Sequence, residues 1–124
     1  SKIIDYKEGS DGMVKLVLTE AGRKRILIYD LDKIKIKKPS RWDRLWRLVV
    51  FDIPEDKKKE RTALVAKLKE IGFYPMQKSI FIYPYECRDE INFIVEIFNL
   101  APHVRFLRVK DIDIELDLRD RFHL

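Results

Sequence analysis

The clearest hydrophobic pattern in the chain begins at Trp46. The nearly all-apolar run Trp46–Phe51 predicts a central strand that is covered on both faces. Apolar residues then recur at helical spacing between residues 64 and 71, which predicts an amphipathic helix that begins with acidic residues near Glu55. Gly72 ends this helix, because glycine accepts the left-handed backbone that helix C-termini often need.

The following segments predict a hairpin, a second helix and a last strand. Residues 73–77 predict a short strand, which Pro75 places at a sheet edge or bulge. Residues 79–85 are aromatic and β-branched and predict its hairpin partner. A helix is predicted over residues 87–99 and a strand over residues 104–109. The order β-α-β-β-α-β is ferredoxin-like, and right-handed crossovers put both helices on one face of a four-stranded antiparallel sheet. The predicted fold class is α+β.

The other face of this sheet also needs a cover. Residues 111–124 carry enough apolar side chains to form a strand and a short helix that pack back. Four aromatic strand residues are too apolar to remain wet, so we expect a homodimer to cover them. They are Phe51, Phe81, Tyr83 and Tyr85.

The N-terminal part of the chain shows a separate pattern. Residues 2–18 predict a β-hairpin around the turn residues Gly9–Gly12, and Thr19 starts a helix that runs to about Tyr29. A basic linker without regular structure follows, interrupted by Pro39. The expected divisions are residues 1–32, the linker 33–44, and the ferredoxin-like domain with its tail, residues 45–124.

Composition narrows the possible partners. The 124 residues carry a formal net charge of +5 and a pI near 9.3. A basic surface of this size favours a polyanionic partner, of which nucleic acid is the commonest. The alternative is a solvated basic shell. The single Cys87 allows no internal disulfide, and no zinc pattern exists. Neither a signal peptide nor an apolar run of about 20 residues is present, so we expect a cytoplasmic protein without membrane segments.

The basic residues cluster in the linker and around the first helix. They are positioned to lie along a phosphate backbone, and we therefore expect duplex DNA as the partner. The candidate nucleic-acid-binding residues are Lys15, Arg23, Lys24, Arg25, Lys35, Lys37, Lys38, Arg41 and Arg44. Trp42 and Trp46 lie among these charges and are expected to pack against the sheet rather than on bases.

From Trp42 to about Val109 the chain resembles the middle domain of the PaaX-like transcription regulators, the phenylacetate-catabolism repressors. The resemblance lies in Trp42-Asp43, Trp46-Arg47, Phe51–Glu55, Gly72-Phe73 and Gln77–Phe81, together with Arg61, Leu64, Leu68 and Pro84. That middle domain is itself similar to the small CRISPR-associated endonuclease, the Cas-two family. The shared marks here are Asp52-Ile53, Lys57–Arg61, Gly72 and the hairpin residues Gln77–Phe81.

The N-terminal part distinguishes the two families. Its predicted hairpin and helix resemble the wing and following helix of a winged-helix domain, which PaaX-like regulators have and the small nucleases lack. We therefore expect a fragment of a DNA-binding transcription regulator, with a wing remnant and a dimerising Cas-two-like domain. A metal-dependent endonuclease for RNA or DNA and a pure oligomerisation module remain the alternatives.

Asp52 is the one candidate catalytic residue. The resemblance to the nuclease family implies that it meets its symmetry mate across a dimer and holds Mg²⁺ near a phosphate. The structural alternative, which we favour, is that its carboxylate accepts N–H bonds in the turn before the helix. No cofactor is expected for the regulator, and Mg²⁺ is expected only for a nuclease. Ser79 lacks an activating neighbour in sequence, so Gln77 and Ser79 are expected to fix the hairpin.

Overall fold

The computed structural model describes residues 4–8, 14–18 and 30–124. The chain divides into two compact units, Ser1–Ile34 and Lys35–Leu124. Each unit is described by itself.

The first unit contains a two-stranded antiparallel sheet. Strands β1 (Ile4–Glu8) and β2 (Val14–Leu18) pair so that Tyr6 lies opposite Leu16. The predicted strands of the N-terminal hairpin are therefore confirmed. Residues 30–33 are helical, although the sequence pattern predicts an end near Tyr29. The rest of the predicted helix, from Thr19 to Tyr29, lies outside the described residues.

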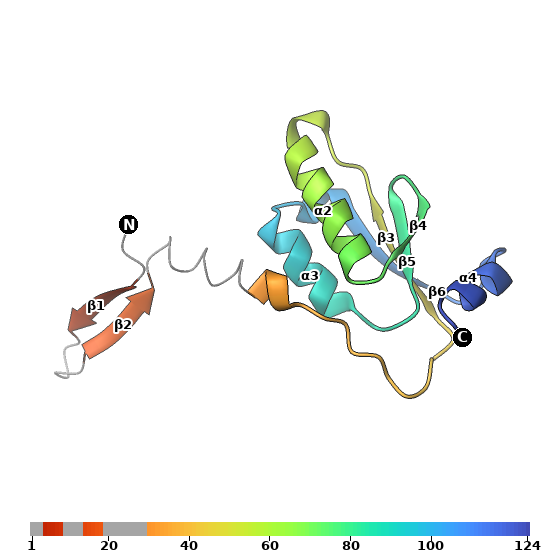
Figure 1. Cartoon of the computed structure of the whole chain (residues 1–124). Helices are drawn as coiled ribbons and strands as arrows, with labels where there is room; N and C mark the ends of the chain where they lie inside the picture. Colours follow the sequence, from red (N-terminus) through yellow and green to blue (C-terminus); the bar gives the residue numbers. More distant parts are fainter. Residues whose placement is uncertain (1–3, 9–13, 19–29) are drawn as a thin grey trace. The chain divides into compact units, whose positions relative to one another are not determined.

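The second unit has the predicted β-α-β-β-α-β order, followed by one more helix (Figure 1). Its elements are β3 (Trp46–Phe51), a 3-10 turn η1 (Glu55–Lys57), α2 (Lys58–Glu70), β4 (Tyr74–Gln77), β5 (Ile80–Tyr83), α3 (Arg88–Ile97), a second 3-10 turn η2 (Ala101–His103), β6 (Val104–Val109) and α4 (Glu115–Arg121).

The four strands form one antiparallel sheet in the order β4-β5-β3-β6. This order is the one that right-handed crossovers through α2 and α3 produce, so the ferredoxin-like α+β fold is confirmed. The central strand β3 has neighbours on both sides, which explains why its sequence is apolar throughout. Pro75 lies on the edge strand β4, where the register shifts between Pro75 and Gln77, as its sequence predicts.

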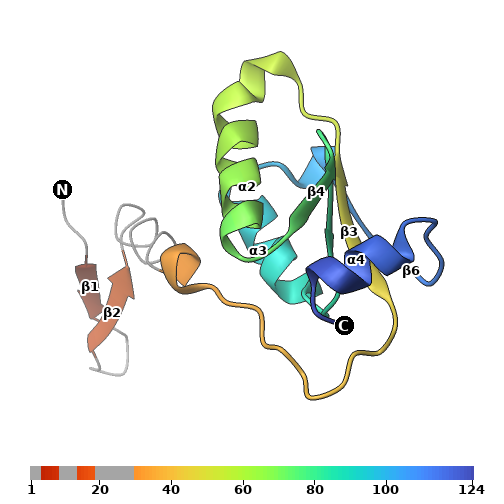
Figure 2. The same ribbon diagram turned by 45° about the vertical axis from the view of Figure 1, so that its right-hand side comes forward.

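Helices α2 and α3 cover one face of the sheet, and α4 lies on the other (Figure 2). Because side chains alternate along a strand, Val49 and Phe51 of β3 face α2 and α3. Phe51 and Phe81 stack at a centroid distance of 5.9 Å, and Phe73 and Tyr83 stack at 5.1 Å. All four rings are at most 5% exposed.

This burial corrects one inference from the sequence. Phe51, Phe81 and Tyr83 were expected to expose aromatic surface on the free sheet face and so to require a dimer. They are instead buried within a single chain, and the strand register and alternation place them on the face that α2 and α3 cover. Tyr85 is half-buried beyond the end of β5, where its ring meets Tyr83 edge to face. The pattern of alternation shows which residues share a face but not which face the helices cover.

The opposite face packs under the C-terminal tail. Trp46, Leu48 and Ile82 from the sheet form a buried cluster with Leu118 of α4, and Phe122 packs at its margin. The predicted helix that packs back is confirmed. The predicted strand before it is wrong, because residues 110–114 bend and turn. The chain has to reverse there if Leu118 is to reach Trp46.

Gly72 ends α2 as the sequence predicts. Its φ is +110°, a backbone conformation that residues other than glycine rarely adopt. A Cβ atom at this position would lie 2.9 Å from Cε1 of Tyr83. The glycine therefore both turns the chain from α2 into β4 and lets the Tyr83 ring approach the backbone.

Candidate nucleic-acid interface

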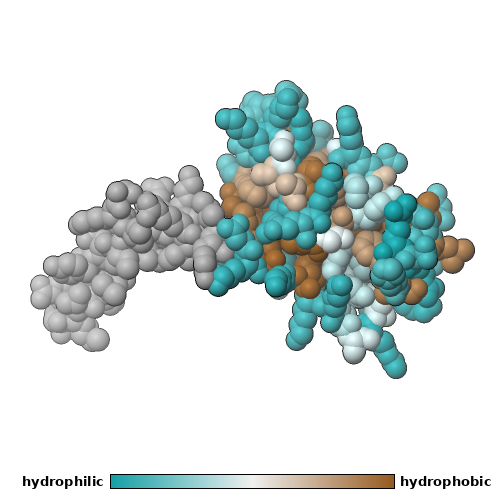
Figure 3. Space-filling model, in the orientation of Figure 1, coloured by the Kyte–Doolittle hydropathy of each residue, from teal (hydrophilic) through white to brown (hydrophobic). Residues whose placement is uncertain are grey.

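The basic segment, residues 35–44, leads into β3 without forming a helix or strand of its own. Its five candidate cations are all exposed: Lys35, Lys37, Lys38, Arg41 and Arg44. Within the part of the chain that the structure describes, their side chains form no hydrogen bond and no ion pair. Their charged groups are consequently available to a partner. Figure 3 shows that hydrophilic residues dominate much of the visible surface of the second unit.

Two tryptophans hold the end of this segment against the sheet. The rings of Trp42 and Trp46 lie 4.8 Å apart at a tilt of 58°. Trp42 Nε1 donates a hydrogen bond to the carbonyl of Leu45 at 3.0 Å, and Trp46 Nε1 donates to Glu115 Oε1 at 3.4 Å. Trp46 is fully buried, which confirms the expectation that these rings pack on the sheet. Neither ring is positioned primarily for stacking on a base.

Arg47 fixes the same end of the segment through its guanidinium group. Its Nη1 atom donates to Asp43 Oδ1 at 2.7 Å and to the carbonyls of Leu45 and Pro84, both at 2.9 Å. Its Nη2 atom donates to Asp43 Oδ2 at 2.5 Å and to Glu86 Oε1 at 3.3 Å. The hydrogen bond from Arg47 is the main reason that the pKa of the Asp43 carboxyl is lowered. The bidentate pair thus ties the segment to the strand it enters.

Glu86 extends this network to the edge strand β6. Its Oε1 atom accepts a hydrogen bond from Arg108 Nε at 2.6 Å, and its Oε2 atom accepts from the backbone N–H groups of Cys87 and Arg88, both at 3.0 Å. Arg108 is the largest cause of a Glu86 pKa lowered to about 2. Glu86 therefore caps the start of α3 and joins it to the sheet.

The sequence reasoning missed the network formed by Asp43, Arg47, Glu86 and Arg108. The i,i+4 spacing of Asp43 and Arg47 is a local signal that could have suggested their ion pair. Glu86 and Arg108 are brought together only by the fold, since α3 and two loops separate them in the chain.

The other predicted basic residues belong to the first unit. Lys15 lies on β2, where its Cα partner across the sheet is Lys7. Arg23, Arg25 and Lys24 lie outside the described residues. The structure therefore describes the candidate cations of residues 35–44, which lie on one segment. It does not show where the candidate cations of the predicted first helix lie.

Asp52 lies one residue beyond β3 and is exposed. Its backbone N–H donates to the carbonyl of His103 at 2.9 Å. The expectation that its carboxylate accepts N–H bonds in the turn is wrong: among the described residues the carboxylate has no hydrogen-bonding partner. Asp52 instead lines a hollow of about 370 Å³ with His103 and Arg105.

Residues 4–8, 14–18 and 30–124 contain no group of three or more His, Cys, Asp or Glu side chains that could hold a metal ion. A single described chain thus offers Asp52 as an isolated carboxylate. Any Mg²⁺ site on it would need ligands from elsewhere, such as a second copy of the chain or the phosphates of a substrate.

The family relationship follows from the chain's comparison with known proteins. The family model of the PaaX protein central Cas2-like domain matches residues 39–119, which is more than half of the chain. This chain belongs to the PaaX family. No curated protein and no solved structure matches it.

The PaaX match begins inside the basic segment and ends inside α4. It therefore includes the two tryptophans, Arg47 and the residues that Arg47 binds. In this PaaX-family chain the Trp42-Asp43 and Trp46-Arg47 pairs are structural, because both pairs attach the segment to the sheet. None of the helices described in this PaaX-family chain is long and apolar enough to cross a membrane.

The hairpin motif Gln77–Phe81 of the PaaX match has a mixed role. Gln77 contributes to the hairpin through its backbone, since it pairs with Ile80 across β4 and β5. Neither the Gln77 nor the Ser79 side chain forms a hydrogen bond in the described part of the chain. The Ser79 carbonyl accepts a hydrogen bond from the backbone N–H of Phe51 at 3.1 Å, which ties the hairpin turn to the end of β3. Both side chains line a larger hollow beside α2.

The Cys87 thiol is a poor candidate for a nucleophile. It is fully buried at the start of α3, and burial is the main cause that raises the pKa of its thiol to about 12. A thiol that resists deprotonation is a poor nucleophile and a poor metal ligand.

Proposed function

We propose that this chain is part of a PaaX-family transcription regulator and contacts the backbone of duplex DNA through the cations of residues 35–44. Two observations together carry the proposal. Five basic side chains of the segment are exposed and unpaired among the described residues. The C-terminal end of the segment is attached to the sheet through the Trp42 ring and the Asp43–Arg47 pair. We further propose that this regulator acts in the cytoplasm.

The attachment matters because it reduces the entropy that DNA binding would cost. A free basic tail loses backbone freedom when it lies along phosphates, about 1–2 kcal/mol for each residue that becomes fixed. Residues 42–47 are already held by the Trp42 ring and by the Arg47 hydrogen bonds. Arg44 lies within that anchored part and Arg41 directly precedes it, so both present their charges from a backbone that is held in place.

The contacts of these side chains are expected to be insensitive to DNA sequence. Lysine and arginine side chains on an irregular segment reach phosphates, and phosphate contacts position a protein without reading bases. Base reading in a winged-helix regulator would come from other elements. We therefore assign residues 35–44 the role of strengthening binding, not of choosing the operator.

We also propose that the chain forms a homodimer. The residues that support this proposal are partly exposed apolar residues of the sheet, not the buried aromatic residues. The register places Leu48 opposite Leu107 and Val50 opposite both Ile80 and Arg105, all on the face that α4 covers in part. Leu107 is 42% exposed, and Val50 and Ile80 are half-buried. A second copy packed on this part of the face would bury them.

The DNA proposal is tested by fluorescence anisotropy with a labelled duplex of arbitrary sequence. The variant Lys35→Ser/Lys37→Ser/Lys38→Ser/Arg41→Ser is expected to bind at least about tenfold more weakly near physiological salt, because several phosphate contacts are lost. The matched control removes four exposed cations that lie on other elements, Lys58→Ser/Lys59→Ser/Arg88→Ser/Lys110→Ser. Equal loss in both variants would show that only net charge matters.

A second candidate function is Mg²⁺-dependent cleavage of RNA or DNA. It is favoured by one observation: the Asp52 carboxylate is exposed at the end of the central strand and has no partner among the described residues. Cleavage by the purified chain with Mg²⁺ that disappears in Asp52→Asn would support it. Absence of cleavage by the wild type would exclude the nuclease function. Asp52→Asn should barely change stability, since the structure shows no bond to the carboxylate.

A further inference from the structure

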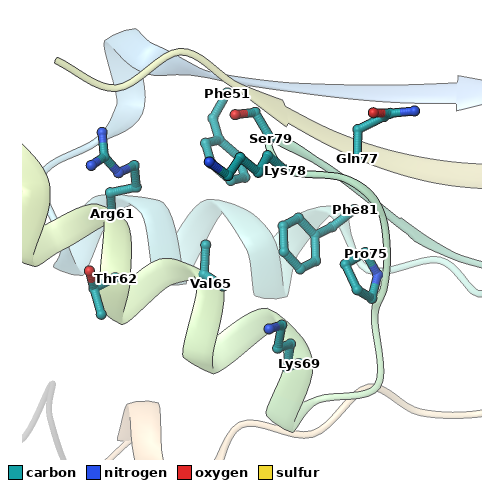
Figure 4. A pocket seen from close by; sticks show the side chains of 10 residues that line it. All are labelled: Phe51, Arg61, Thr62, Val65, Lys69, Pro75, Gln77, Lys78, Ser79 and Phe81. Carbon is teal, nitrogen blue, oxygen red and sulfur yellow. The ribbon is translucent and has the colours of Figure 1, made fainter. Parts of the chain in front are cut away.

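A hollow of the second unit lies between α2 and the β4–β5 hairpin, and its residues are separate in sequence from the proposed DNA contacts. Its volume is about 770 Å³, within the usual range of small-molecule sites, roughly 300–1,000 Å³. Figure 4 shows residues of α2 facing the hairpin across this space. The lining residues are Phe51, Arg61, Thr62, Val65, Lys69, Pro75, Gln77, Lys78, Ser79 and Phe81.

One wall of the hollow is apolar. Val65 of α2 lies opposite Pro75 and Phe81 of the hairpin (Figure 4). Val65 is half-buried and Pro75 is exposed, so both retain apolar surface that a ligand could cover. The Phe51 and Phe81 rings lie deeper, at 5% and 2% exposure. They form a rigid base for the wall, since they are stacked on one another.

The rim of the hollow is cationic and comes from two separate elements. Arg61 and Lys69 are eight positions apart on α2, which places them on the same side of the helix, while Lys78 lies in the hairpin turn. Lys69 and Lys78 are exposed and form no ion pair in the described part of the chain. Arg61 is held by the carbonyl of Ile53 and by Glu55, both at 3.3 Å.

Among the described residues, no acidic side chain lines this hollow. In the described structure, Arg61 of the rim pairs with the Glu55 carboxylate, whose side chain is 76% exposed. A long ion pair with an exposed carboxylate contributes little, so an anion in the hollow could replace it at small cost. The electrostatics therefore favour an anionic occupant, and the apolar wall favours one with an apolar body.

We propose that this hollow binds a small organic anion, with its apolar body on Val65 and Pro75 and its negative charge attracted by the cationic rim of Lys69, Lys78 and Arg61. The polar side chains of Gln77 and Ser79, which form no hydrogen bond of their own in the described structure, supply further contacts for the anion. This site does not depend on the proposed DNA contacts of residues 35–44, which line none of it.

The probe for this site is anilinonaphthalene sulfonate, an anion with a flat apolar body whose fluorescence rises in apolar surroundings. The whole chain is titrated with the probe, and then the variant Lys69→Gln/Lys78→Gln is titrated. Two lost charge-assisted contacts are expected to weaken binding by about tenfold or more. The control Lys58→Gln/Lys59→Gln removes equal charge from the first turn of the same helix, outside the hollow, and is expected to bind like the wild type.

Two further measurements identify what is bound. Uncharged phenylnaphthylamine is expected to bind weakly and equally to the wild type and to Lys69→Gln/Lys78→Gln. Thermal unfolding of each variant should match the wild type, which excludes loose folding as the source of fluorescence. Equal affinity of the two lysine variants for the sulfonate would overturn the proposal. So would a short DNA duplex that displaces the probe only when Lys69 and Lys78 are present, because the hollow would then be a phosphate-backbone contact.

Discussion

Arg47 is the residue on which the attachment of the basic segment depends. Its side chain is almost completely buried, at 3% exposure, and it donates to two carboxylates and two carbonyls. Its Nε atom is buried without a partner, a cost that the other hydrogen bonds must offset. Removing one partner of such a group is far more damaging than replacing the whole network, because the remaining charge stays buried.

The network makes stability depend on pH through Glu86. Its pKa is lowered from 4.5 to about 2 in the folded chain, chiefly by the hydrogen bond from Arg108. The folded state thus binds a proton less readily than the unfolded state, so the stabilisation is complete above about pH 4.5 and is lost as the pH falls toward 2. Urea unfolding at a series of pH values should show this loss.

The variant Glu86→Gln should be less stable than the wild type at neutral pH and should approach it near pH 2. Glu96→Gln is the control, since Glu96 is exposed on α3 and its carboxylate has no partner in the described structure. A stability difference between wild type and Glu86→Gln that stays constant from pH 7 to 2 would contradict the role of Glu86.

At the scale of elements, α4 covers part of the sheet face that lies opposite α2 and α3 (Figure 2). The strand β3 alternates strictly, with Trp46 and Leu48 under α4 and with Val49 and Phe51 under α2 and α3. A single helix of seven residues is too short to be stable alone, so α4 exists because it packs on Trp46. Arg121 adds a contact over the Tyr74 ring at 4.3 Å.

Two leucines on α4 allow a matched test of this packing. Leu118 is fully buried on Trp46, whereas Leu116 is 83% exposed. Leu118→Ala should lower the free energy of unfolding by about 2–4 kcal/mol, because it leaves a cavity between α4 and the sheet. Leu116→Ala should change it by less than about 0.5 kcal/mol. Urea denaturation of both variants measures the difference, and equal values would show that α4 does not cover the sheet in solution.

The success of sequence reasoning at this scale depended on periodicity. The positions of β3, α2 and β6 follow from apolar runs and helical spacing, and Gly72 and Pro75 act as the sequence predicts. The helix-covered face could not be predicted, since alternation is symmetrical about the sheet; this is why Phe51 and Phe81 were assigned to the wrong surface. Contacts such as Glu86 with Arg108 require the tertiary fold, and the hollow beside α2 requires side chains from four separate elements.

At the scale of the whole molecule, the basic character is distributed unevenly. The formal net charge is +5, and the segment of residues 35–44 contributes five exposed cations against the single acid Asp43, which is already paired with Arg47. The family match and the strand order establish the Cas2-like domain, and the uneven charge on its surface is the basis of the proposed DNA contact.

Assembly is tested by light scattering on the purified chain at tens of micromolar, where we expect a dimer. Leu107→Lys is expected to shift the mass toward monomer, because it places a charge in the patch with Val50 and Ile80. Leu116→Lys puts the same charge on an exposed position of α4 and should leave the mass unchanged. A wild-type chain that is monomeric at this concentration would contradict dimerisation through the sheet face.

The central claim, phosphate contact by residues 35–44, is tested most directly by the salt dependence of DNA binding. Each phosphate neutralised on duplex DNA contributes about −0.9 to the slope of log K against log salt. The variant Lys35→Ser/Lys37→Ser/Lys38→Ser/Arg41→Ser should therefore flatten the wild-type slope by roughly three to four. The control Lys58→Ser/Lys59→Ser/Arg88→Ser/Lys110→Ser should keep the wild-type slope. An unchanged slope in the first variant would mean that the segment is a solvated surface and does not contact DNA.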